Sequence, residues 1–442
     1  MITTQRIDLT RYMPGIDSVR QIRFLGKVTQ VVGLVIEGYC PDTAVGTLCE
    51  IHPVGGEPIP AEVVGFRDNK TLLMPLGELR GVGLGSLISV RRKSASLKVG
   101  PGLLGRVING LGIPIDDKGP VLADEEYPIY AAPVNPMKRK PIRKPLDLGI
   151  RAINGLLTCG QGQRVGIMAG SGVGKSTLLG MIARYTEADV NVIALIGERG
   201  RELQEFIEKD LQREGLSKSV VVVATSDQPP LVRMRGAYIA TTIAEYFQSQ
   251  GKKVLLMMDS ATRFAMAMRE VGLAIGEPPT TKGYTPSVFA ALPKLLERTG
   301  NFHNGSITGL YTVLVEGDDF NEPISDAMRS ILDGHISLSR DLAARNIYPP
   351  IDVLSSASRV MMDVTGTEQQ QLAGRFKELM ATYRQSEDLI NIGAYKAGSN
   401  PKIDRAIGKM DEMVAYMKQD IRDAVSFDQA LGGLEKIFPA EH

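Results

Sequence analysis

The amino-acid sequence predicts an α/β protein, in which a parallel β-sheet covered by helices follows a small β domain and precedes a helical domain. Residues 21–93 contain short Val- and Ile-rich runs broken by turn residues, a pattern typical of a small barrel or sandwich. From about residue 146 apolar runs alternate with helical stretches, which indicates a parallel sheet. From about residue 366 only helical periodicity remains.

The charge balance and the cysteine content restrict the class of protein. The 51 lysines and arginines nearly equal the 50 acidic residues, so no field that would attract nucleic acid or a membrane is expected. The three cysteines have no metal-binding spacing, which favours a reducing compartment. The N-terminal stretch MITTQRIDLTRYMPG carries charges where a signal peptide needs apolar residues. We therefore expect a soluble cytoplasmic protein that binds no nucleic acid.

A glycine- and proline-rich stretch at about 97–145 contains the basic segment KRKPIRKP at 138–145. A nuclear localisation signal and a nucleic-acid patch are its functional interpretations. We interpret it instead as a solvated linker interrupted by proline, because no aromatic residue interleaves with the basic ones.

In the region from about residue 146, we expect apolar strands and helices to alternate along the chain. A helix is expected at 230–250, where apolar residues recur at spacings of three and four. After 366 one helix face is marked by Leu372 and Phe376, and 403–437 is expected to continue helically. The expected core strands are residues 164–168, 192–196, 220–224, 254–258 and 307–315.

The segment RVGIMAGSGVGKSTLLGMIARY at 164–185 predicts a phosphate-binding loop between a strand and a helix. Glycines let backbone N–H groups curl around phosphate oxygens, and the helix start adds its positive dipole end. Lys175 is expected to reach the β- and γ-phosphates of ATP, and the Ser176 hydroxyl to hold Mg²⁺. The alternative is a plain glycine-rich turn. The expected loop residues are Ala169 (where the strict pattern has glycine), Gly170, Ser171, Gly172, Val173, Gly174, Lys175, Ser176 and Thr177.

Two further strands end in charged residues that suit this loop. The strand in KKVLLMMDSATRF ends at Asp259, which is expected to hold the magnesium through water. The strand in NVIALIGERGRE is followed by Glu198, which is placed to polarise a water in line with the γ-phosphate. Arg199 is expected to pair with carboxylates across a subunit contact, and Glu202 to lie near the metal. The alternative is a surface cluster of ion pairs, usually worth less than about 1 kcal/mol.

The segment YPPIDVLSSASRVM at 348–361 supplies the remaining candidates. Arg359 follows a Ser-rich turn and could neutralise charge in the transition state. Tyr348 precedes two prolines that fix the backbone, so its ring is presented rigidly and could stack on adenine.

These motifs together resemble those of the type III protein-export ATPases, relatives of the rotary ATP synthase α and β subunits. The segments that carry the resemblance are AGSGVGKST, IGERGRE, LLMMDSATRFAMAMRE, TVLVEGDDFNEPISDAMRSILDGHISLSRDLA and YPPIDVLSSASR. GDDFNEP at 317–323 and IGAYKAGSNPKIDRAI at 392–407 are more similar to the flagellar than to the virulence branch.

The resemblance implies a RecA-like P-loop ATPase core with an N-terminal β-barrel and a C-terminal α-helical domain. The boundaries expected on this basis are an N-terminal segment at 1–20, the barrel at 21–95, the ATPase domain at 96–365 and the helical domain at 366–442. It further implies that Glu198 is the catalytic base, that Arg359 acts as a finger from the neighbouring subunit, and that Tyr348 stacks on adenine.

The same resemblance implies a flagellar export ATPase that couples Mg-ATP hydrolysis to the unfolding and delivery of export substrates. Its expected partners are five further copies in a homohexamer, a stator-like regulator at the N-terminus, a coiled-coil central stalk, substrate–chaperone complexes and a membrane export gate. Its expected place is the cytoplasm, at the periphery of the membrane export apparatus.

Several alternatives share part of this pattern. A virulence secretion ATPase and a rotary ATP synthase catalytic subunit carry the same motifs, whereas a non-catalytic nucleotide-binding subunit would have no use for Glu198. An RNA-translocating hexamer such as the transcription terminator would need a basic, aromatic-bearing N-terminal domain, and here Phe24 and Phe66 stand isolated. A signalling GTPase would need an Asn-Lys-x-Asp motif, which does not occur.

Overall fold

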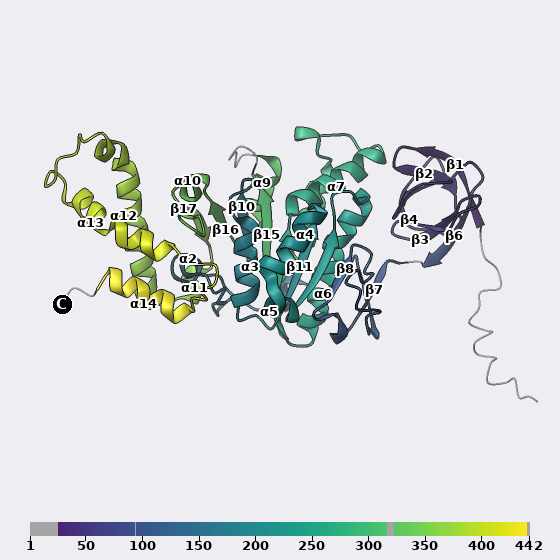
Figure 1. The fold of residues 1–442 in the computed structure, drawn as a ribbon. Coiled ribbons are helices and arrows are strands. Elements are labelled where there is room, and N and C mark those ends of the chain that lie inside the picture. Colours follow the sequence, from purple (N-terminus) through teal and green to yellow (C-terminus); the bar gives the residue numbers. More distant parts are fainter. Residues whose placement is uncertain (1–24, 93, 316–321, 440–442) are drawn as a thin grey trace, which may run out of the picture. The chain divides into compact units, whose positions relative to one another are not determined.

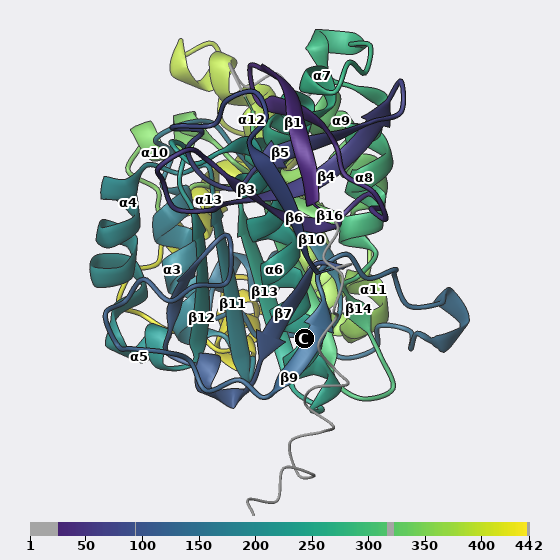
Figure 2. The same cartoon turned by 90° about the vertical axis from the view of Figure 1, so that its right-hand side faces the viewer.

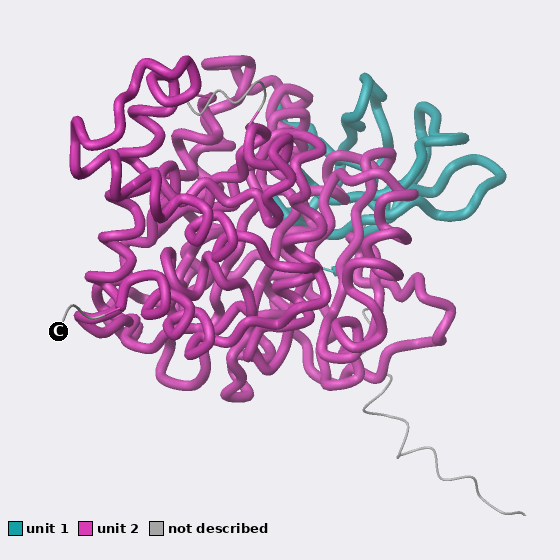
Figure 3. The backbone as a smooth tube through the Cα atoms, turned by 60° about the vertical axis from the view of Figure 1, so that its left-hand side comes forward, with its two compact units in different colours: residues 1–95 teal, residues 96–442 magenta. Residues whose placement is uncertain are grey.

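The structure is a computed structural model that describes residues 25–92, 94–315 and 322–439. The expected N-terminal segment at 1–20 and most of the GDDFNEP motif lie outside the described residues. The chain forms two compact units, residues 1–95 and 96–442 (Figure 3), which are described separately.

The first unit is a closed antiparallel barrel, so the choice between barrel and sandwich is decided for the barrel. Its strand order is β1-β2-β5-β4-β3-β6, and the closure leaves no free sheet edge. Side chains that alternate along the strands, such as Val28, Ile36, Ile51 and Leu73, fill the interior. The strands are β1 (Leu25–Val32), β2 (Val35–Tyr39), β3 (Leu48–His52), β4 (Ile59–Arg67), β5 (Lys70–Pro75) and β6 (Leu87–Arg92).

The second unit is built on a nine-stranded sheet with the order β17-β16-β10-β15-β13-β11-β12-β8, and β14 pairs with β15 beside this path. All five predicted core strands are present and pair in parallel. Every residue of β11 and β12 is buried, which explains their continuous apolar runs. The sheet strands are β8 (Val107–Asn109), β10 (Arg164–Ala169), β11 (Val190–Ile196), β12 (Ser219–Ala224), β13 (Lys253–Asp259), β14 (Gly300–Asn301), β15 (Ser306–Leu314), β16 (Gly334–Leu338) and β17 (Ile351–Ser358).

Helices cover this sheet, as Figures 1 and 2 show. The predicted helix at 230–250 is α6, which packs against β11, β12 and β13. The helices between β9 and residue 365 are α2 (Arg151–Leu156), α3 (Lys175–Tyr185), α4 (Gly200–Glu205), the π-helical η4 (Phe206–Leu211), α5 (Gln212–Ser217), α6 (Pro230–Ser249), α7 (Ala261–Ala274), α8 (Pro286–Leu296), α9 (Pro323–Ile331), α10 (Arg340–Ala344) and α11 (Met361–Val364). Short 3-10 turns are η2 (Pro101–Leu103), η3 (Pro136–Lys138) and η5 (Thr281–Gly283).

The glycine- and proline-rich stretch is more structured than its composition suggests. It contains β8, which extends the parallel sheet beside β12, and β7 (Ser96–Val99) paired with β9 (Glu125–Pro128). In the basic segment, Arg139 donates to the carbonyl of Glu297, and the Lys140 N–H donates to the carbonyl of Asn301 at 2.9 Å. The interpretation as a solvated linker was therefore only partly correct, because these contacts bind the segment to the end of α8 and to β14.

Two local predictions were wrong. The Ser-rich stretch before Arg359 is not a turn between strands but part of β17, which pairs antiparallel with β16. Ser337 pairs with Asp352, and His335 pairs with Ala357. One residue of β16 therefore faces residues 353–356 of β17, and these form a bulge. The local turn chemistry is real, because Asp352 accepts from two backbone N–H groups, but sheet pairing overrides it.

The expected helix at 403–437 is interrupted. It forms α13 (Pro401–Met417) and α14 (Phe427–Ile437), separated by an irregular segment at 418–426. Ser426 begins α14 with a capping box, a local signal that was present in the sequence. With α12 (Thr367–Asn391) these helices gather beside α2 within the second unit (Figure 1). Of the helices in the described residues, none is long and apolar enough to cross a membrane.

Candidate active site

The phosphate loop connects the end of β10 to the start of α3. Gly172 and Gly174 have φ angles of 76° and 94°, in the left-handed region that favours glycine. Ala169 and Val173 are buried and support the loop from behind. A cavity of about 770 Å³ opens in front of it. Its walls are Gly170, Ser171, Gly172, Gly174, Lys175, Ser176, Thr177, Gly197, Glu198, Arg199, Glu202, Ser226, Arg263, Leu314, Val315 and Arg340.

Three predicted charged residues meet beside this cavity. The Lys175 ammonium forms an ion pair with Asp259 and lies 3.7 Å from Oε1 of Glu198. The Thr312 hydroxyl donates to Oδ1 of Asp259 at 2.7 Å, so a residue of the neighbouring strand β15 holds that carboxylate. Parallel strands bring these groups together because their carboxyl ends meet at one edge of the sheet.

Burial shifts the proton equilibria of this cluster. Burial raises the pKa of Glu198, and the nearby carboxylate of Asp259 raises it further, while Lys175 and Arg263 oppose the shift. For Lys175 burial lowers the pKa, but the attraction of Asp259 and Glu198 outweighs it and leaves the pKa raised. Perturbed groups in a cavity are typical of catalytic sites.

The sequence interpretation missed several of the residues that complete this site, namely Thr312, Arg263 and Arg340. The Nε of Arg263 is buried and has no hydrogen-bond partner in the described part of the chain. A Cβ on Gly197 would stand 2.8 Å from the Cβ of Arg263, so glycine between β11 and Glu198 lets α7 approach. The Arg in DSATRF, one helical turn after Asp259, was the available signal.

Glu202 lies on α4 at the rim of the cavity, and Arg199 directly precedes this helix. Nη1 of Arg199 lies 3.3 Å from Oε1 of Glu202, and the two side chains are 70% and 41% exposed. The arginine thus pairs with a nearby carboxylate of its own chain.

Tyr348 and Arg359 are placed differently from each other. A Cβ on Gly174 would stand 3.7 Å from Cε1 of Tyr348, so the half-exposed ring borders the phosphate loop. Arg359 is absent from the cavity wall and donates to the carbonyl of Arg329 at 3.3 Å.

The residues beside the loop suit a magnesium ion. Ser176 offers a hydroxyl on the cavity wall, and Asp259 offers a carboxylate behind Lys175. Hydroxyl and carboxylate oxygens are ligands that Mg²⁺ prefers, with phosphates and waters completing the shell. No group of three or more His, Cys, Asp or Glu able to hold a metal by itself occurs among the described residues. The donors therefore fit a metal that arrives with a nucleotide.

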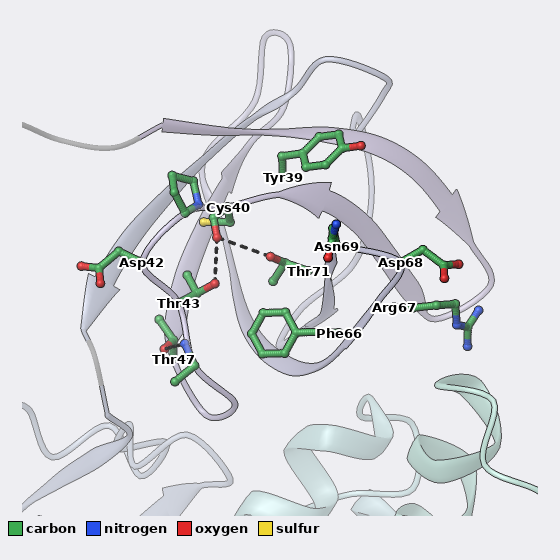
Figure 4. A pocket seen from close by; sticks show the side chains of 12 residues that line it. Tyr39, Cys40, Asp42, Thr43, Thr47, Phe66, Arg67, Asp68, Asn69 and Thr71 are labelled. Carbon is green, nitrogen blue, oxygen red and sulfur yellow. Dashed lines mark hydrogen bonds between the residues drawn. The ribbon is translucent and has the colours of Figure 1, made fainter.

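A second cavity, of about 840 Å³, lies in the barrel unit (Figure 4). Tyr39 and Phe66 flank it, and the Thr43 and Thr71 hydroxyls both donate to the carbonyl of Cys40. These two hydroxyls hold the loop after β2.

Comparison with known proteins agrees with this geometry. Residues 149–358 match the nucleotide-binding domain of the ATP synthase alpha/beta family, and residues 365–436 match the T3SS EscN ATPase C-terminal domain. The Flagellum-specific ATP synthase of Bacillus subtilis (strain 168) is 54% identical, covering 93% of this chain and 94% of that protein. The Type 3 secretion system ATPase of Xanthomonas euvesicatoria is 48% identical, covering 92% and 93% respectively.

A solved structure is similar over the same span. It is that of the assembled ATPase EscN in complex with its central stalk EscO, from the enteropathogenic E. coli type III secretion system. The TM-score is 0.87 at 47% identity, and the match covers 93% of this chain and 99% of that one. The chain therefore belongs to the ATP synthase alpha/beta family, as an ATP-hydrolysing enzyme related to the flagellum-specific and type III secretion ATPases.

Proposed function

We propose that this chain is the ATPase of a bacterial flagellar protein export apparatus, which couples Mg-ATP hydrolysis to the unfolding and delivery of exported subunits. The observation that carries the enzymatic part is the convergence of Lys175, Glu198 and Asp259 beside the phosphate-loop cavity. The flagellar assignment is supported by the flagellum-specific relative of Bacillus subtilis at 54% identity; other flagellum-specific relatives, at 46–50%, overlap the 48% of the secretion relative. A virulence secretion ATPase remains the second candidate, supported by the likeness to EscN.

Each residue of the site has a separate role in the proposed hydrolysis of ATP. Lys175 leaves its carboxylate partners to neutralise the β- and γ-phosphates, and Glu198 orients and deprotonates the attacking water. Ser176 and Asp259, with Glu202 at the rim, would hold Mg²⁺, which neutralises phosphate charge when it is bound. Tyr348 stacks on the adenine.

Arg359 completes the site of an adjacent subunit in this proposal. Its absence from the cavity of its own chain supports an action in trans. A guanidinium supplied from a neighbour is worth about 10³–10⁵ in rate in P-loop hydrolases. We therefore propose a homohexamer in which Arg199 also contacts carboxylates across the subunit boundary.

We infer the other partners of this chain from the family to which it belongs. We propose a coiled-coil stalk in the centre of the ring, a stator-like regulator at the N-terminus, and contacts with substrate–chaperone complexes and the membrane export gate. The stalk is supported by the likeness to EscN, which was solved in complex with its central stalk EscO. The chain would then act in the cytoplasm at the periphery of the export apparatus.

An ATPase assay on mixed variants tests the shared site. Glu198→Gln and Arg359→Ala should each be inactive alone, and mixing them should restore part of the activity, because some interfaces pair an intact Glu198 with an intact Arg359. Light scattering establishes that rings have formed. Rings without recovery, together with wild-type activity that is independent of concentration, would exclude action in trans.

Complementation separates the two export systems. Expression of this chain in a bacterium that lacks its flagellar export ATPase should restore swimming. Restoration of effector secretion in a strain lacking the virulence ATPase, without restoration of swimming, would favour the second candidate.

A further inference from the structure

Gln419 occupies the irregular segment between α13 and α14 and is almost completely buried, at 6% exposure. Its side-chain Oε1 accepts the N–H of Arg151 at 2.7 Å. Its Nε2 donates to the carbonyls of Gly149 and Asp423, both at 2.8 Å. Both donor hydrogens and one acceptor site of the amide are thus used. The side chain fixes this segment to the ATPase region just before α2.

The main chain of the same residue reaches the candidate nucleotide site. The Gln419 N–H donates to the carbonyl of Tyr348 at 2.9 Å. Tyr348 in turn borders the phosphate loop at Gly174 and exposes 44% of its surface. Residues 419 and 348 are far apart in the chain, and this hydrogen bond ties the tyrosine backbone to the helical region.

We infer that Gln419 is a positioning residue for nucleobase binding: its side-chain amide holds the backbone whose N–H fixes Tyr348 beside the phosphate loop. This inference rests on the proposed stacking of Tyr348 on the base. The ligand class it affects is a nucleotide with an aromatic base, whereas a bare phosphate ligand contacts only the loop.

Other contacts between the two regions are weaker candidates for this role. Arg345 pairs with Glu387, and Arg384 pairs with Asp352, but the arginine side chains are 53% and 57% exposed. Ion pairs exposed to solvent contribute little. Beside them lies a cavity of about 110 Å³, lined partly by methionines of α12 and α13, so side-chain packing does not fill this contact. The hydrogen bond to Tyr348, by contrast, comes from a residue that is almost completely buried.

Gln369 provides a matched control. It is also a buried glutamine, 3% exposed, that joins the helical region to the ATPase region. Its Nε2 donates to the carbonyls of Asn154 and Gly155 and to the Thr158 hydroxyl, at 2.9, 3.1 and 3.0 Å. It makes no contact with Tyr348 in the described structure. A purely structural loss should affect both glutamines in the same way.

Calorimetric titration with ADP and with inorganic pyrophosphate tests the inference on the full-length protein. Tyr348→Ala should weaken ADP binding by about tenfold, as expected for loss of a base–aromatic stack, and leave pyrophosphate binding unchanged. Gln419→Met should weaken ADP binding by about fivefold, a fraction of that stack, and also spare pyrophosphate. In turnover, Gln419→Met should raise KM for ATP and leave kcat unchanged. Gln369→Met should change neither affinity.

The outcomes separate the inference from the role on which it rests. Wild-type ADP affinity in Gln419→Met, with weakened ADP binding in Tyr348→Ala, overturns the positioning role alone. Wild-type ADP affinity in Tyr348→Ala overturns the stacking role and the inference with it. Equal loss of ADP and pyrophosphate binding in both glutamine variants shows a structural role and also overturns it. If Gln419→Met fails to fold, Gln419→Glu replaces it, since it keeps the shape and the acceptor for Arg151.

Discussion

The cavity at the phosphate loop and the cavity in the barrel have similar volumes, about 770 and 840 Å³, but different walls. The first is bordered by an ion-pair cluster of half-buried Lys175 and Glu198 with buried Asp259. The second is bordered by the exposed rings of Tyr39 and Phe66. The hydroxyls of Thr43 and Thr71 donate to the Cys40 carbonyl.

The difference shows that volume does not identify an active site in this protein. Charges buried together shift each other's protonation and are held ready for a ligand, whereas exposed groups are screened by water. Changes at the phosphate-loop cavity should therefore affect catalysis strongly, and changes at the barrel cavity should not.

The largest effect is expected from Lys175→Ala. The ammonium contacts phosphate in both the ground and transition states, so ATP affinity should fall by at least about 100-fold and turnover should vanish with it. Isothermal titration and an ATPase assay measure the two losses. Lys218→Ala is the control, because Lys218 donates to the carbonyls of Arg184 and Thr186 away from the cavity. Unchanged ATP affinity in Lys175→Ala would remove this lysine from the phosphate site.

Glu198→Gln should separate binding from chemistry. The amide keeps the shape but cannot take a proton, so Mg-ATP should still bind while kcat falls by about 10²–10⁴. Glu208→Gln is the control and should keep the wild-type kcat, because this exposed carboxylate accepts from Nε2 of Gln204 and is not part of the cavity wall. Turnover within about threefold of wild type in Glu198→Gln would falsify the role of this residue as the base.

Thr312→Val should reduce kcat by about tenfold, since a hydrogen bond to a charged group contributes about 1.5–3 kcal/mol. The variant removes the donor to Asp259 and keeps the side-chain volume. Thr308→Val is matched, because Thr308 is buried on the same strand but accepts from the N–H of Gly162. Steady-state rates of both variants, with thermal midpoints as a check on folding, measure the difference. Equal kcat losses would show that β15 packing, and not the bond to Asp259, is responsible.

The pH dependence should follow the raised pKa of Glu198. The base must be deprotonated, so kcat/KM is retained above this pKa and lost as the pH falls through it. Arg263 lowers the pKa of Glu198, so Arg263→Met should move the acid limb to higher pH. Wild type and Arg263→Met use the same ATP, so protonation of the nucleotide affects both pH profiles equally and does not contribute to the shift between them. An acid limb that stays in place would mean that another group controls it.

The smallest effect is expected in the barrel. Tyr39→Ser combined with Phe66→Ser should leave kcat and KM unchanged, since exposed substitutions usually alter stability by less than about 0.5 kcal/mol. The assay uses protein concentrations at which rings form. A changed kcat with an unchanged thermal midpoint would show that the barrel cavity influences catalysis after all.

Most of the core could be predicted because its signals are local. The phosphate loop, the five central strands and the long helix at 230–250 each carry their pattern within about 20 residues. Where local signals conflicted with pairing, the prediction failed: the Ser-rich stretch before Arg359 reads as a turn, but β16 holds it as a strand. The break between α13 and α14 was also missed: no glycine or proline stands at 418–426, and the capping-box pattern of Ser426 and Gln429 that marks the start of α14 was overlooked.

The sequence by itself determined the class of the protein, the phosphate loop, and the charged residues that end two strands, because strand and turn preferences act between near neighbours. Only the tertiary structure decided which distant groups join them. Thr312 reaches Asp259 because β13 and β15 are neighbours in the sheet, and Gln419 reaches Tyr348 because the helical region packs beside α2. Such contacts depend on how whole elements pack, and no pattern along the chain encodes which residues will meet.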